Sequence, residues 1–147
     1  KERLYKTVNR AYGHVKYKKG GYKIYQQEDL LDQILGDKSI YSTIDDMLKW
    51  DQSLYNHTLV SEKLTEEAFQ KGILNNNKEF NYGYGFRIRE YKDNSISKYI
   101  VYHNGWWHGF KASLTRYIED KYTVIILNNT NAHIGMIIND IEKVLFN

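Results

Sequence analysis

The chain has no cysteine, no proline and no long apolar run. The absence of cysteine excludes a disulfide framework and a metal site built from thiolates, and it leaves the redox compartment open. Average usage would give about seven prolines in a chain of this length. We attribute this bias to AT-rich codon usage, because tyrosine, lysine, asparagine and isoleucine are abundant. The apolar runs are too short to span a bilayer, so no transmembrane helix is predicted.

The remaining composition is that of an ordinary globular protein. Hydrophobic residues make up 41% of the chain and charged residues 27%, and a length of 147 residues suits one domain with a buried core. The formal net charge is +3, with basic and acidic residues interleaved. The densest basic run, Lys16–Lys19, is interpreted as a solvated loop, and nucleic-acid binding is not predicted.

Two helices are predicted in the first half of the chain. Ser42 to Asp46 combine a hydroxyl N-cap with acidic residues in the first turn, which is typical of a helix start. Mostly apolar residues at helical spacing continue this helix to Asn56. The same logic begins a second helix at Ser61, which Gly72 and the asparagines after it bring to an end.

The second half has the two-residue period of β-strands, beginning at Tyr82. Three further strands are predicted over Tyr99–Tyr102, Phe110–Ile118 and Thr123–Leu127. The last of them is apolar enough to be buried on both faces, and the short turns between strands imply an antiparallel meander. A final helix, capped by Thr130 or Asn131, should place an apolar stripe on one face of the sheet.

The predicted fold is therefore one α+β domain, an antiparallel β-meander packed against a C-terminal helix, with further helices before the sheet. Residues 1–35 form an irregular tyrosine-rich region that includes short strands around the turn at Gly20-Gly21. Residues 36–80 are helical, and residues 81–147 hold the sheet and the last helix. No internal repeat and no long linker divides the chain.

The segment with the most chemical content is His103–Gly105, which follows a predicted strand and precedes a loop expected over Trp106–Phe110. An imidazole, a short amide and a glycine at a strand end are typical of one wall of an active site, because glycine lets a ligand approach the backbone closely. The N–H of Trp106 is then placed to act as an oxyanion donor. The alternative is that His103 is a structural histidine held by hydrogen bonds.

The other motifs predict no metal site, no cofactor site and no nucleophile. His103 and His108 lack the helical spacing of a zinc-binding pair, and no glutamate lies between them. Tyr82–Gly85 favours a strand with close backbone packing over a phosphate loop. Ser95–Lys98 has the spelling Ser-x-x-Lys of a nucleophile motif, but that motif requires a helix to bring both side chains to one face, and here a turn leads into a strand.

Several segments, taken in order, carry the features of a known family. Gly36–Trp50 is similar to a helix entry with the pattern Tyr-Ser-Thr-x-x-Asp, and Tyr82–Phe86 to a Tyr-Gly-x-Gly-aromatic strand. His103–Gly105 with Gly109-Phe110 is similar to a third motif in which His-x-Gly replaces Lys-Thr-Gly, and Val124–Asn129 to a valine-rich strand ending in Asn. Together they resemble the C-terminal portion of the serine β-lactamase and penicillin-binding protein superfamily, in its class C-like esterase and D-alanyl-D-alanine peptidase branch.

The resemblance implies a partial β-lactamase/transpeptidase-like fold and an acyl-enzyme mechanism on a β-lactam, a D-Ala peptide or an ester. In the family, the Ser-x-x-Lys helix and the Tyr-x-Asn motif lie N-terminal to the matched segments, so this chain is expected to be inactive alone. Carried across, His103 would polarise the site or bind a substrate carboxylate, Gly105 would let the substrate approach, and the Trp106 N–H would complete the oxyanion hole. No cofactor is implied.

Substrate-binding roles follow for the neighbours of these residues, namely Asn104, Trp107, His108 and Tyr41. Asn104 holds a position that is usually Thr, Ser or Gly in the family. A second hypothesis stays open, a non-catalytic domain of the same fold that binds cell-wall peptide or glycan in an aromatic cleft.

The implied partners are a small-molecule or cell-wall peptide substrate and the N-terminal half of the same hydrolase. In the family, N-terminal strands and a helix complete the sheet beside the strand equivalent to Tyr122–Leu127. Without them that strand is expected to expose an apolar edge, which is prone to pairing in a homodimer or by strand exchange. Family members are bacterial and are often exported or associated with the cell envelope.

Overall fold

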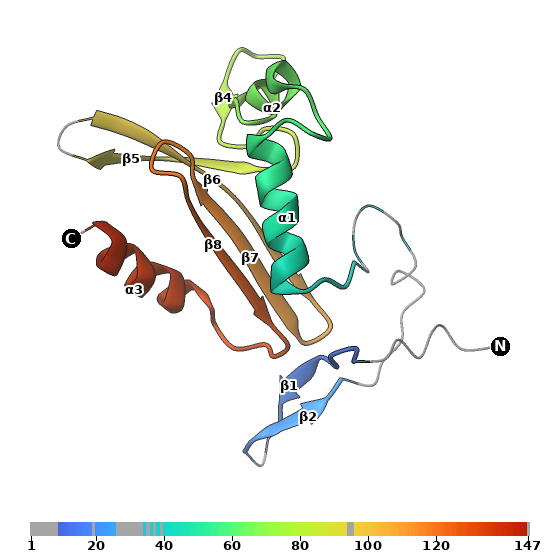
Figure 1. The fold of residues 1–147 in the computed structure, drawn as a ribbon. Coiled ribbons are helices and arrows are strands. Elements are labelled where there is room, and N and C mark those ends of the chain that lie inside the picture. The colour runs from blue at the N-terminus through green and yellow to red at the C-terminus, as the bar shows by residue number, and fades with distance from the viewer. Residues whose placement is uncertain are drawn as a thin grey trace.

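The computed structural model describes residues 9–18, 20–25, 34, 36, 38, 40–93 and 96–146. Over these residues the predicted α+β class is confirmed: a four-stranded antiparallel sheet lies between one helix on each face (Figure 1). No helix in the described ranges is long and apolar enough to cross a bilayer.

The sheet is the predicted meander. Its strands are β5 (Arg87–Asp93), β6 (Ile96–Trp107), β7 (Phe110–Tyr117) and β8 (Tyr122–Asn128), and they lie side by side in chain order. The strand expected from Tyr82 begins later, at Arg87, because the backbone first passes through Gly85 with a φ of +80°. Asn81 accepts the Ile88 N–H at 3.1 Å, which ties this preceding loop to the start of the strand.

Strand β6 is much longer than predicted and includes His103–Gly105 and both following tryptophans. The prediction of a loop over Trp106–Phe110 is therefore wrong. The turn consists of His108 and Gly109 alone, and both adopt positive φ, +44° and +80°. Two successive positive φ values suit the twist of a two-residue hairpin, so the ladder between β6 and β7 continues to the tip.

Helix α1 (Ile44–Tyr55) confirms the predicted cap. The Thr43 hydroxyl accepts the Asp46 N–H at 3.1 Å, and the helix ends at Asn56. Helix α2 (Glu62–Ala68) begins after Ser61, as predicted, but it ends at Ala68. The residues that follow form a small hairpin of β3 (Gly72–Ile73) and β4 (Glu79–Phe80) in place of further helix.

Helix α3 (Gly135–Phe146) begins later than predicted. Thr130 caps no helix: its hydroxyl accepts the Ala132 N–H at 3.1 Å and donates to Asn128 at 2.9 Å, which closes a turn after β8. The helix packs on the sheet through Phe146, whose ring lies 4.9 Å from that of Tyr117. None of its residues is fully buried. Within the described chain the helix packs against the sheet on one side, and its other sides face solvent.

Strand β8 is only partly buried, which corrects the expectation that both of its faces are covered. It is the edge strand of the sheet, and Tyr122 and Leu127 are 48% and 41% exposed. An edge strand has a neighbour on one side only, so an apolar sequence does not by itself bury it.

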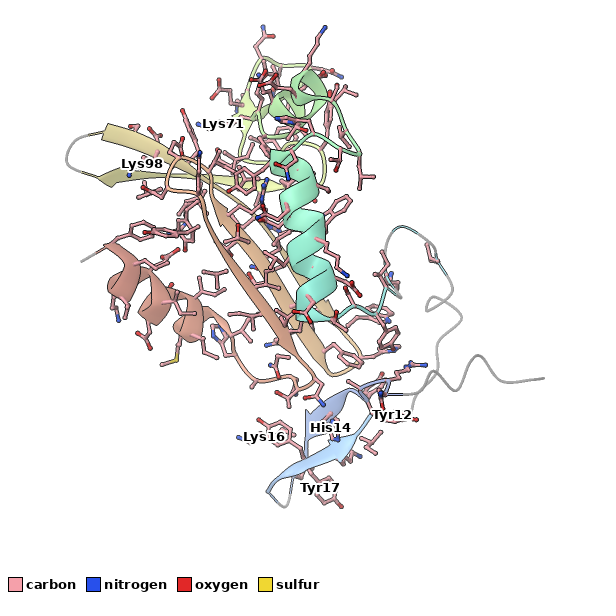
Figure 2. The ribbon with its side chains drawn as sticks, viewed as in Figure 1. Tyr12, His14, Lys16, Tyr17, Lys71 and Lys98 are labelled. Atoms are coloured by element: carbon pink, nitrogen blue, oxygen red, sulfur yellow. The ribbon has the colours of Figure 1, made fainter. Side chains whose placement is uncertain are left out.

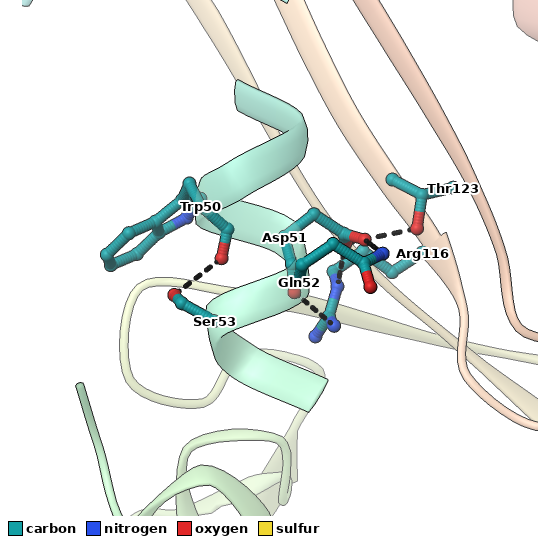
Figure 3. A network of polar contacts seen from close by, with 6 residues as sticks. All are labelled: Trp50, Asp51, Gln52, Ser53, Arg116 and Thr123. Atoms are coloured by element: carbon teal, nitrogen blue, oxygen red, sulfur yellow. Dashed lines mark hydrogen bonds and ion pairs between the residues drawn. The ribbon is translucent and has the colours of Figure 1, made fainter. Parts of the chain in front are cut away.

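A buried ion pair fixes α1 on the sheet (Figure 3). Asp51 of α1 accepts from Nε of Arg116 on β7 at 2.6 Å and from the hydroxyl of Thr123 on β8 at 3.0 Å. The two charged side chains are 1% and 0% exposed. The guanidinium also lies 4.3 Å from the centroid of the Tyr55 ring. Because Tyr117 beside Arg116 faces α3, the two helices cover opposite faces.

The short strands β1 (His14–Lys16) and β2 (Tyr22–Ile24) form the hairpin expected in the N-terminal region. Figure 2 labels His14 on this hairpin. Its N–H donates to the carbonyl oxygen of Asn129, directly after β8, at 2.8 Å. A Cβ on Gly13 would lie 2.0 Å from the His108 carbonyl oxygen, and one on Gly109 would lie 2.6 Å from the His14 nitrogen. Glycine at both positions lets this hairpin contact the β6–β7 turn.

Candidate active site

The candidate site is the part of β6 that extends beyond β5. Strand β5 begins at Arg87, opposite Tyr102, so residues 103–107 of β6 have β7 on one side. Within the described residues no strand pairs with the other side of this stretch. Residues 103–107 are therefore an open edge of β6, whereas residues 100–102 of the same strand pair with both β5 and β7.

The register gives the direction of the backbone groups along this edge. In a two-residue hairpin the closing pair, here Trp107 and Phe110, exchanges its hydrogen bonds, and bonded pairs alternate along an antiparallel ladder. Trp106 and Asn104 therefore turn their N–H groups away from β7. The β5–β6 ladder agrees, because the Ile88 N–H donates to Asn81, away from β6, and alternation then makes its neighbour Arg87 a bonded partner of Tyr102. The Trp106 N–H thus points outward from the open edge of β6.

Gly105 lies in this stretch without a structural requirement for glycine in the described residues. A Cβ there would meet only the Ala112 Cβ, at 3.7 Å, an ordinary contact, and its φ is not positive. By contrast, a Cβ on Gly13 or Gly109 would lie within 3.0 Å of backbone atoms. Glycine inside a strand weakens it and often marks a place where another backbone approaches closely. The space above Gly105 is open for such an approach.

His103 lies on the same face of the sheet as Gly105 and Arg116, the face that α1 covers. Its side chain is exposed, and its Nε2 lies 3.1 Å from the hydroxyl of Tyr82. The ring is thus hydrogen-bonded, as the structural interpretation required, and it is also accessible, as a substrate contact requires. Tyr82 was not predicted as a site residue. The available signal was its motif, Tyr82–Gly85, which the sequence analysis interpreted as close backbone packing and as part of the family resemblance, without a role at the site.

Trp107 and His108 belong to a stack of side chains at the tip of the β6–β7 hairpin. Their rings lie 4.4 Å apart, His108 stacks on Tyr25 at 4.6 Å, and the Lys38 ammonium lies 4.4 Å from the Trp107 ring centroid. These contacts hold the hairpin tip against residues that precede α1. They bring Trp107 and His108 together at one end of the open edge.

Tyr41 lies near the same tip through its edge-on contact with Phe110, with ring centroids 5.7 Å apart. The Arg10 guanidinium lies 4.3 Å from the Tyr41 ring centroid and donates to its hydroxyl. Tyr41 is therefore next to the predicted site, at the end opposite His103 and Tyr82.

Asn104 and Trp106 project their side chains from the other face of the sheet, because successive residues of a strand alternate. The Trp106 indole is 76% exposed. Only the backbone of these two residues shares the open edge with His103. The chain contains a triplet with the spelling Tyr-x-Asn, Tyr102–Asn104, but its Tyr and Asn side chains lie on this other face.

The remaining motifs have other structural roles. Lys98 of β6 lies opposite Tyr91 of β5 and forms an ion pair with Asp120 (Figure 2), while Ser95 lies outside the described residues. Gly83 packs on α2, since a Cβ there would lie 2.0 Å from the Ala68 carbonyl oxygen. No group of three potential metal ligands occurs among the residues that the structure describes.

Comparison with known proteins identifies the family. The β-lactamase family model matches residues 4–141, almost the whole chain. The chain belongs to the β-lactamase family. It is 37% identical over 100 residues to penicillin-binding protein 4* of Bacillus subtilis (strain 168), which covers 67% of this chain. The crystal structure of a penicillin-binding protein from Bacillus halodurans matches 91% of this chain with a TM-score of 0.67 at 24% identity.

This β-lactamase-family chain is short beside those relatives. It spans 21% of the length of the Bacillus subtilis protein and 40% of the Bacillus halodurans chain. The expected resemblance to a portion of the superfamily is therefore confirmed, together with a partial β-lactamase-like fold.

Proposed function

We propose that this chain forms one wall of a serine acyl-transfer site and that another segment of the hydrolase supplies the nucleophile. The substrate would be a β-lactam, a D-Ala peptide or an ester. The observation that carries the proposal is the open edge of β6, where an outward Trp106 N–H lies one residue from Gly105, with free space above it. Backbone donors at a developing oxyanion are a large source of catalysis in acyl transfer.

In this proposal the Trp106 N–H stabilises the tetrahedral intermediate and Gly105 admits the substrate backbone. His103, on the same face, donates a hydrogen bond to a substrate carboxylate or carbonyl. Trp107, His108 and Tyr41 would limit the other end of the substrate groove, and the Asn104 backbone would lie along it.

The isolated chain should not turn over substrate, because no described serine has an activating base. The serine hydroxyls whose contacts are known bind backbone groups or, for Ser113, the hydroxyl of Thr115 at 3.1 Å. A serine nucleophile needs a base within hydrogen-bond reach.

The proposed partner is the N-terminal half of such a hydrolase, docked along the free edge of β8. Half-exposed apolar residues there, such as Leu127, would otherwise promote pairing between copies of the chain. We expect concentration-dependent dimerisation that a Leu127→Lys variant abolishes. Light scattering that shows a monomer at every concentration would contradict this part of the proposal.

A titration with acetyl-D-alanyl-D-alanine, followed by 1H–15N NMR, tests the site. We expect the largest shifts at the amide of Trp106, and we expect Gly105→Val to abolish them because its branched side chain fills the approach space. Ala132→Val, at an exposed position after β8, is the control for added bulk. Shifts confined to other regions would overturn the placement of the site.

Covalent labelling with a fluorescent penicillin separates the catalytic hypothesis from the binding one. We expect no adduct on this chain, and an adduct on a longer gene product that includes upstream sequence. A stable adduct on any serine of this chain would refute a nucleophile located elsewhere. Saturable binding without labelling of the longer product would instead favour a cell-wall peptide-binding domain.

A further inference from the structure

The contact between Tyr82 and His103 joins two segments that are separate in the fold. Tyr82 precedes β5, whereas His103 lies in β6, and the hydroxyl and imidazole Nε2 are 3.1 Å apart. The rings meet nearly edge-on, with an interplanar angle of 73° and centroids 6.1 Å apart. This is the one hydrogen bond of the His103 ring within the described residues.

Tyr82 is held by its backbone on both sides. Its N–H donates to Phe80 at 2.8 Å, its carbonyl accepts from Gly72 at 3.0 Å, and it pairs with Arg87 at the start of β5. A Cβ on Gly72 would lie 2.2 Å from the Phe80 ring, so only glycine permits this close approach. The tyrosine is therefore placed by the β3–β4 hairpin, independently of the histidine that it contacts.

The chemistry of the two groups gives the hydrogen bond a direction. A neutral imidazole has one N–H and one acceptor nitrogen, and the bond made by one nitrogen fixes the state of the other. A phenolic O–H is more acidic than the N–H of a neutral imidazole, so we take the Tyr82 hydroxyl as the donor and Nε2 as the acceptor, which leaves the proton of the neutral imidazole on Nδ1. An exposed imidazole without such a donor favours the opposite, Nε2–H form.

We propose that Tyr82 is a positioning residue that fixes the ring of His103 and keeps it in the Nδ1–H form, so that His103 presents a hydrogen-bond donor beside Gly105. The proposal rests on the proposed function for the role of that donor, which would bind a carboxylate or carbonyl oxygen of the substrate. It assigns to the Tyr82–Gly85 motif a purpose beyond packing.

The test observes the ring nitrogens of His103 by long-range 1H–15N correlation at alkaline pH, with His103→Gln to assign the signals. We expect the Nδ1–H form to predominate in the wild type and the Nε2–H form in Tyr82→Phe, which keeps the ring and removes only the hydroxyl. Tyr84→Phe is the matched control, because Tyr84 is 64% exposed and its hydroxyl binds Glu67 at 2.6 Å. It should leave the His103 signals unchanged.

A wild-type spectrum dominated by the Nε2–H form overturns the proposal, even where the variant fails to fold. Identical tautomers in the wild type and Tyr82→Phe overturn it as well. A second measurement is the affinity for acetyl-D-alanyl-D-alanine, which Tyr82→Phe should lower about five-fold, as expected for one hydrogen bond. A tautomer change in a chain that does not bind this peptide would uphold the positioning role and count against the proposed function.

Discussion

The ion pair between Asp51 and Arg116 should be the most sensitive polar contact in the fold. Both side chains are buried, and Nη1 of Arg116 already has no hydrogen-bond partner among the residues that the structure describes. An Asp51→Leu variant removes the carboxylate that accepts from Nε and leaves the guanidinium with the Asp51 backbone carbonyl at 3.4 Å. Removing one partner of a buried pair costs about 3–5 kcal/mol, because the other charge stays buried without compensation.

A loss of that size is a large fraction of the stability of a domain, which is typically about 5–15 kcal/mol. For a chain of this length it should lower Tm by roughly 10–15 °C. Urea denaturation followed by circular dichroism measures the change in the free energy of unfolding. Asp140→Ala is the matched control, because Asp140 pairs with Lys143 at an exposed position and should show no measurable change.

The double variant Asp51→Leu with Arg116→Met distinguishes the cost of an isolated charge from the loss of packing. Replacing both partners of a buried pair by apolar side chains is often neutral or stabilising, so the double variant should recover most of the lost stability. If Asp51→Leu alone cost under about 1 kcal/mol, or if the double variant were the less stable one, the assignment of a buried, mutually compensating pair would be wrong.

Two further predictions concern pH and glycine. Hydrogen bonds from Lys98 and Tyr91 hold the pKa of the Asp120 carboxyl below its ordinary value of 3.8, so its contribution to stability is present above pH 3.8 and is lost as pH falls through the lowered pKa. Acid unfolding should therefore be shallower in Asp120→Asn than in the wild type, and equal slopes would contradict the bonding of this carboxylate. Gly13→Ala should destabilise the chain because its Cβ would lie 2.0 Å from a carbonyl oxygen, whereas Gly105→Ala should change Tm little because its nearest contact is at 3.7 Å. Thermal denaturation of the two variants checks this contrast, and equal losses would refute it.

Local sequence determined the elements whose signals lie within a few residues. Thr43 and Ser61 cap α1 and α2 because an N-cap hydroxyl needs only the N–H group three residues later. The two-residue period that begins at Tyr82 and the short turns between strands were enough to predict the antiparallel order of the sheet. The family resemblance also depended on short motifs in a fixed order, and almost the whole chain matches that family.

Tertiary structure decided the features that depend on distant partners. The extent of β6 depends on His108, whose positive φ is uncommon for a non-glycine residue. The exposure of β8 depends on its position at the sheet edge, and a strand's sequence does not specify how many neighbours it has.

The candidate site likewise has features that local sequence determined and features that only tertiary contacts decided. The residue types of His103–Gly105 were sufficient to predict a wall of a site, since that prediction needs only a strand and the groups along it. The contact of His103 with Tyr82 spans 21 residues, and that of Asp51 with Arg116 spans 65. No periodicity within one element encodes such a distance, because each contact exists only once the sheet and its covering segments have packed together.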